Sequence, residues 1–277
     1  MSTEPVRGLS GQSGAFVGRQ PAGCNMYLET VSQEKNPKEV WQEHLKGVYE
    51  SAKMMSNNAL GRQRTPDRAL KLMAKLHAIT ETNIGIVSAR LQALPQAQRE
   101  MMTPQCSAGC DYCCVQLVRV TACEVLAVYA FVKANFSEEA QEDLLKRLVE
   151  TKEYTLSKPA TTSFRHQCPM LVDHKCSVYF SRPFICRGIN SASVAACKAG
   201  YAADSTGPAA IPIVDSMRDV AVSVRWGLKE SMVEQGLEGP DLYLHLAMLT
   251  LMQDASAVDK FFVGEPVFQS AVIPANE

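Results

Sequence analysis

Residues 106–124 read CSAGCDYCCVQLVRVTACE, so a run of cysteines stands directly before a helix start. Four cysteines fall within nine residues, among Ser, Gly and Asp, which favour turns over a buried core. Thr121 and Glu124 then have the spacing of a capping box, and apolar residues follow as far as Val132. The stretch therefore predicts an irregular cysteine-rich segment set directly before a helix.

Helical signals lie on both sides of this stretch. Asn36, Pro37 and Glu39 resemble a capping box with proline at the first helical position, and apolar residues follow at helical spacing. Capping residues and periodicity predict further helices over 36–61, 65–95, 137–156, 191–200, 213–235 and 241–254. No sustained alternation of period two indicates strands. We expect a mainly α fold, a helical bundle-like scaffold that carries an irregular cysteine-rich metal-binding insert.

The sequence predicts four parts. The first is glycine-rich and lacks apolar periodicity, which is typical of a flexible tail. The four parts are a flexible N-terminal tail (1–35), a helical hairpin extension (36–104), a cysteine-cluster metal-binding module (105–200) and C-terminal helices (201–277). The helical extensions are candidate surfaces for a protein partner.

Composition limits the class of protein. The chain has 277 residues with 28 Lys and Arg against 29 Asp and Glu, which excludes the basic footprint of a dedicated nucleic-acid binder. The N-terminus has no apolar run typical of a secretory signal, and the apolar stretches elsewhere are too short or too charged to span a membrane. We therefore expect a cytoplasmic protein. In a reducing cytosol, its ten cysteines favour metal ligation over disulfides.

Eight of the ten cysteines form two groups that we interpret as metal ligands. Two thiolates separated by two or three residues can bind one ion. Adjacent cysteines in regular structure point apart, so one of them would bind a different ion or approach the same cluster from another side. Eight thiols exceed the four that one structural zinc requires, so iron, as a [4Fe–4S] cluster for example, or a multinuclear site competes with zinc. The candidates are Cys106, Cys110, Cys113, Cys114, Cys168, Cys176, Cys186 and Cys197.

Two arginines and two histidines near these cysteines are further candidates for the site. Arg182 and Arg187 flank Cys186 and are candidate charge partners for the anionic thiolates. His166 and His174 each precede a cysteine by two residues, and either a ligand or a hydrogen-bond donor fits that position. No phosphate-binding loop, dinucleotide fingerprint, zinc-protease motif or nucleophile elbow occurs, so no catalytic acid or base is nominated.

The second cysteine group reads CPMLVDHKCSVYFSRPFICR over residues 168–187. With the first group, it resembles the YkgJ-type cysteine-cluster proteins, described as zinc- or iron-chelating domains, and the resemblance covers residues 106–197. It implies a metal-binding module, and Thr121 with Glu124 matches the helix start of that family. The chain departs from the family at residues 188–191, where GINS replaces a frequent aromatic-proline pair, and in the helices that precede the motif.

Two enzyme alternatives share part of this motif. A flagellin lysine methylase looks similar, which implies an iron–sulfur centre alongside S-adenosylmethionine. Cys106, Cys110 and Cys113, with Tyr112 before the last, match the signature of radical S-adenosylmethionine enzymes, although those resemble a β/α barrel that this sequence does not predict. Three functions therefore compete: metal storage or delivery, metal-dependent modification, and a scaffold with a structural metal. Whether the protein is an enzyme stays open.

Overall fold

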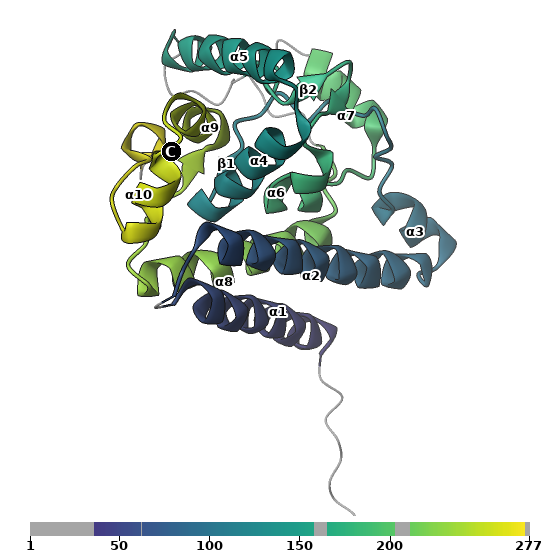
Figure 1. Ribbon diagram of the computed structural model, residues 1–277. Coiled ribbons are helices and arrows are strands. Elements are labelled where there is room, and N and C mark those ends of the chain that lie inside the picture. The colour runs from purple at the N-terminus through teal and green to yellow at the C-terminus, as the bar shows by residue number, and fades with distance from the viewer. Residues whose placement is uncertain (1–35, 62, 158–164, 203–210, 275–277) are drawn as a thin grey trace, which may run out of the picture. The chain divides into compact units, whose positions relative to one another are not determined.

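The computed structural model describes residues 36–61, 63–157, 165–202 and 211–274 (Figure 1). The tail expected over 1–35 lies outside the described residues, whereas the described residues from Lys38 onward fold as one unit. The helices are α1 (Pro37–Leu60), α2 (Pro66–Gln92), α3 (Gln96–Met102), α4 (Ala122–Asn135), α5 (Glu138–Ser157), α6 (Phe184–Gly188), α7 (Val194–Ala202), α8 (Asp215–Glu234), α9 (Leu244–Gln253) and α10 (Ala257–Val263). The expected mainly α fold is confirmed.

Short strands and 3₁₀ turns complete the described structure. The elements are β1 (Arg119–Val120), β2 (Leu171–Val172), β3 (Lys175–Cys176), β4 (Leu242–Tyr243), η1 (Tyr179–Ser181) and η2 (Gln269–Ala271). β1 pairs with β4 and β2 pairs with β3, both antiparallel. The described strands thus contain no parallel pair, which a β/α barrel would require.

Helix starts follow the capping signals of the sequence. Thr121 caps α4: its side chain accepts a hydrogen bond from the backbone N–H of Glu124, and the Glu124 carboxylate accepts one from the Thr121 N–H at 2.7 Å. Thr65 caps α2 in the same manner, with Pro66 at the first helical position. Both predicted starts are confirmed, because a capping residue satisfies N–H groups that the helix itself leaves without a partner.

The core lies where α2, α4, α8 and α9 pack together, and α4 runs through the middle of the unit (Figure 1). Eight of the 14 residues of α4 are buried, from Ala122 to Val132, so both faces of that helix are covered. Phe184 on α6 and Phe261 on α10 are among the largest fully buried side chains. Burying such side chains is the main favourable term in folding.

The two long helices of the 36–104 segment, α1 and α2, share this core. Leu72, Met73 and Leu76 of α2 are buried with residues of α4 and α8, and α6 packs against both α2 and α8. The short helix that carries Cys186 is therefore held between two long helices. None of the described helices is both long and apolar enough to cross a membrane.

Candidate metal centre

The first cysteine group lies in the turns that join α3 to β1. The backbone N–H of Cys110 bonds to the Ser107 carbonyl at 3.0 Å, and that of Cys114 bonds to the Asp111 carbonyl at 2.8 Å. Gly109, inside the first of these turns, has φ +86°, a conformation that favours glycine. Two successive tight turns therefore bring four thiols into one short loop, as the turn-forming residues of the sequence predict.

Cys113 and Cys114 interact with each other through their thiols. A hydrogen bond from Cys114 lowers the pKa of Cys113 to about 7, and the same bond raises the pKa of Cys114. We expected adjacent cysteines to point apart, which holds for regular structure. This segment is a turn instead, and here the two neighbouring thiols interact.

The second cysteine group begins with a β-hairpin. β2 and β3 are joined by Asp173 and His174, whose φ angles of 49° and 60° fit a two-residue hairpin turn. Burial raises the pKa of Cys168 to about 11, and a hydrogen bond from the Met170 backbone N–H opposes this rise. Burial also raises the pKa of Cys176, and the Val178 backbone N–H opposes that rise in the same way. Backbone N–H groups that point at a sulfur stabilise its thiolate form, so the surroundings of Cys168 and Cys176 suit metal ligation.

The two cysteine groups meet at the hairpin, and α6 supplies a further thiol. The backbone N–H of Cys168 donates to the Cys114 carbonyl at 2.7 Å. Burial raises the pKa of Cys186 well above its ordinary value, and the charges of Cys168, Cys176 and Cys113 raise it further. The thiols that act on one another here come from three chain segments: Cys113, Cys114, Cys168, Cys176 and Cys186.

Arg187 and Arg182 lie beside these thiols. Arg187 is held by three hydrogen bonds, to the carbonyls of Arg182 at 2.9 Å and Phe180 at 2.6 Å and to the Glu81 carboxylate at 2.6 Å. Arg182 lies 3.5 Å from the same carboxylate and stacks over the Tyr179 ring. Burial raises the pKa of Cys176, and the two arginines oppose that rise. Both guanidinium groups therefore favour the ionised form of this thiol, and their role beside a bound metal stays a prediction.

Glu81 was not predicted, and it is the residue that fixes both arginines. It lies on α2, more than a hundred residues before Arg187, and nothing in the local sequence around it marks a site. Glu124 was predicted only as a capping residue. Its carboxylate also accepts a hydrogen bond at 2.9 Å from the Phe184 N–H, which anchors the start of the helix that carries Cys186.

The remaining thiols form a second grouping near Ser191. The Ser191 N–H donates to the Cys106 sulfur at 3.3 Å, and the Gln105 N–H donates to the Ser191 carbonyl at 2.9 Å. Burial raises the pKa of Cys106, and the charges of Cys110, Cys113 and Cys197 contribute to the rise. Cys113 thus lies between this grouping and the one around Cys186.

Both candidate histidines have other contacts. Nδ1 of His174 lies 2.8 Å from the Asp111 carboxylate, and the ring of His166 stacks on Tyr154 with centroids 4.7 Å apart. Across the described residues, no three His, Cys, Asp or Glu side chains are arranged as a group that could hold a metal ion. The nine described cysteines are all free thiols.

A metal bound by thiolates needs cysteine ligands, with backbone N–H donors and cations around them. The cysteines, N–H groups and arginines of this region are of these kinds, so the donor chemistry fits zinc or iron. The chain brings these groups to one region without closing them into a coordination shell. Comparison with models of known protein families, with curated proteins and with solved structures found no match.

Proposed function

We propose that residues 105–200 bind a metal through thiolates, either iron, with a [4Fe–4S] cluster as the leading form, or zinc. The observation that carries this proposal is the convergence of five thiols from three chain segments: Cys113, Cys114, Cys168, Cys176 and Cys186. Thiols that raise one another's pKa are costly to ionise together. A cation that bound them would reverse that cost, because it favours the deprotonated form.

The surroundings of the thiols support ligation. Four thiolates around a divalent ion leave net negative charge, and Arg182 and Arg187 are placed to offset it. The N–H groups of Met170 and Val178 face the sulfurs of Cys168 and Cys176. When bound, an iron–sulfur cluster would supply electron transfer, whereas zinc would supply a closed structural site or Lewis acidity.

The motif supports the same class of function. Residues 106–197 resemble the YkgJ-type cysteine-cluster proteins, and the segments that carry the resemblance are the ones that meet at Cys114 and Cys168. Three further thiols, those of Cys106, Cys110 and Cys197, are linked to this group because Cys113 and the other two act electrostatically on Cys106. They could complete a multinuclear site, and this would use all eight candidate cysteines.

The first test is the metal and acid-labile sulfide content of protein purified without oxygen, together with its absorption spectrum. Iron with sulfide and a broad band near ~400 nm would indicate a cluster, and S-adenosylmethionine binding would then be measured. Zinc without sulfide would indicate a chelating or structural role. Neither metal above trace amounts would overturn the proposal.

Variants locate the ligands. We expect Cys186→Ser combined with Cys168→Ser to reduce bound metal to a small fraction of wild type, because both sulfurs belong to the converging group. Cys123→Ala is the matched control, since Cys123 is buried in α4 and its pKa is perturbed by burial and Glu124 alone. Wild-type metal content in the double variant, or an equal loss in the control, would contradict ligation at this site.

A further inference from the structure

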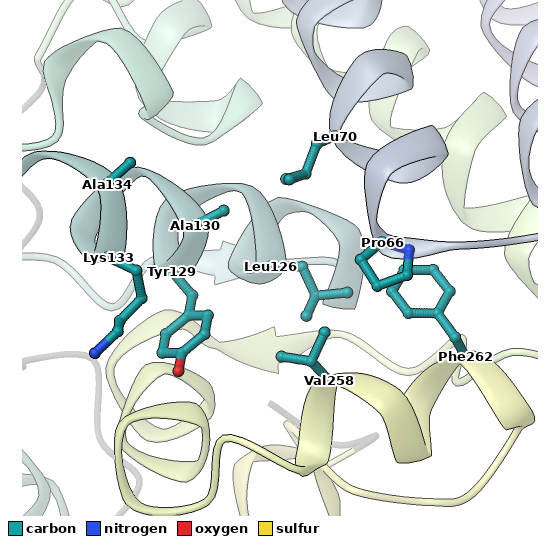
Figure 2. A pocket seen from close by; sticks show the side chains of 9 residues that line it. All are labelled: Pro66, Leu70, Leu126, Tyr129, Ala130, Lys133, Ala134, Val258 and Phe262. Atoms are coloured by element: carbon teal, nitrogen blue, oxygen red, sulfur yellow. The ribbon is translucent and has the colours of Figure 1, made fainter.

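A cavity of about 350 Å³ lies apart from the cysteines, between α2, α4 and α10 (Figure 2). Pro66 and Leu70 come from the first turns of α2, Leu126 and Tyr129 from α4, and Phe262 from α10. The volume is at the lower end of the range for small-molecule sites, about 300–1,000 Å³. The cavity is therefore large enough for a small ligand.

The walls of this cavity are apolar, and its polar groups lie at one end. Among the lining side chains, only those of Tyr129 and Lys133 carry polar atoms. Figure 2 shows the Tyr129 hydroxyl and the Lys133 ammonium on the same side, away from Phe262 and Pro66. An amphipathic ligand fits this division, with its head at Lys133 and its chain along the apolar wall.

Lys133 gives the polar end its charge. Its ammonium donates to the Gln141 side-chain oxygen at 2.6 Å, which is a neutral acceptor. Among the ion pairs of the described residues, none joins Lys133 to a carboxylate. An ammonium and a hydroxyl donor at the same end of the cavity complement a carboxylate, while a cationic head group would be repelled.

We propose that this cavity binds a free medium-chain aliphatic carboxylate. The carboxylate accepts hydrogen bonds from Lys133 and Tyr129, and the chain contacts Leu126, Leu70 and Phe262. Each buried methylene of the chain contributes to affinity through the hydrophobic effect. The site shares no residue with the candidate metal centre, so this proposal does not depend on metal binding.

Calorimetric titration with decanoate below its micelle-forming concentration tests this proposal, with decan-1-ol and decyltrimethylammonium as companion ligands. We expect saturable one-to-one binding of decanoate, weaker binding of the alcohol and the weakest binding of the cation. Lys133→Met keeps the aliphatic stem and should weaken decanoate binding about tenfold, the loss expected for one charge-assisted hydrogen bond.

Ala130→Phe fills the cavity from α4 and should abolish binding. Ala74→Phe makes the same substitution at an exposed position of α2 and should leave binding unchanged. Circular dichroism checks that both variants fold. The proposal is overturned if wild type shows no saturable binding, if Ala130→Phe binds like Ala74→Phe, or if decan-1-ol binds as tightly as decanoate.

Discussion

The backbone N–H of Cys168 donates a hydrogen bond to the carbonyl of Cys114, with nitrogen and oxygen 2.7 Å apart. This bond joins the two cysteine groups directly, although the whole of α4 and α5 lies between them in the chain. A second long-range bond, from the Phe184 N–H to Glu124, fixes the helix that carries Cys186. The backbone thus holds the cysteine-bearing segments next to one another.

Among the nine described cysteines, Cys113 is expected to be the first thiol alkylated in metal-free protein at pH 7. The hydrogen bond from Cys114 lowers its pKa to about 7, so about half of it is thiolate, which is the nucleophilic form. Cys123 should not react, because burial raises its pKa to about 12. Brief iodoacetamide treatment followed by peptide mass spectrometry measures the order.

Two further samples check the cause of this reactivity. Cys114→Ala removes the hydrogen bond and should slow alkylation of Cys113 severalfold. Bound metal should protect Cys113 if it is a ligand. Faster labelling of Cys123 than of Cys113 would show that the pKa order is wrong.

The sequence predicted local features well and long-range ones poorly. The capping box at Thr121 and the start at Thr65 are confirmed because each depends on residues within one helical turn. The two-residue strands β1 and β4 could not be read from periodicity, since a pattern of period two needs a longer run. Glu81 was missed for a related reason: its partners are brought to it only by the packing of α6 on α2.

The glycine at position 188 has a structural explanation in the packing of α6 on α8. A Cβ atom at this position would lie 2.5 Å from the Cβ of Ala221 and 3.0 Å from the Met217 carbonyl oxygen, both on α8. α6 therefore packs so closely on α8 that only glycine fits, a requirement that the sequence alone does not reveal.

Gly188→Ala should consequently destabilise the protein by roughly 1–3 kcal/mol, the usual cost of overpacking. It should also lower metal content, because the displaced helix carries Cys186. Gly85→Ala is the matched control: a Cβ at Gly85 meets nothing within 4 Å, so alanine should stabilise α2 by about 0.5–1 kcal/mol. Urea unfolding measures both values, and equal effects of the two substitutions would refute the close approach.

Removing the metal with a chelator should leave the helical fold intact. The core around Phe184, Phe261 and Leu76 is formed by helix packing. We expect the far-UV circular dichroism to persist, with protease sensitivity gained in the loop 103–118. Loss of the helical signal on chelation would instead indicate a scaffold that folds only with its metal.

Glu81→Gln should lower the free energy of unfolding by about 1–2 kcal/mol. The change removes the charge that pairs with Arg187, whose side chain is only 6% exposed, while two carbonyl hydrogen bonds to Arg187 remain. Asp143→Asn breaks an exposed pair with Lys146 and should cost less than about 0.5 kcal/mol. Similar losses in the two variants would show that Glu81 does not anchor the arginines.

His77 should make stability depend on pH in acid. It packs edge-on against Phe184, and burial, with the charges of Arg187 and Arg182, lowers its pKa from 6.5 to about 3. The unfolded chain therefore binds a proton between these pH values that the folded protein does not. The free energy of unfolding should fall as pH drops from about 6.5 towards 3, by at most about 1.4 kcal/mol per pH unit from this residue.

His77→Gln removes the titrating group from this position and should flatten that dependence. It should not abolish it, because burial also lowers the pKa of His245, to about 4, with the same sign of effect. Urea unfolding of both proteins at intervals from pH 7 to pH 4 measures the two slopes. Their difference isolates His77, whatever other groups titrate in common. Parallel slopes would mean that His77 takes up its proton as readily in the folded protein as in the unfolded chain, and that the contact with Phe184 does not exclude the charged ring.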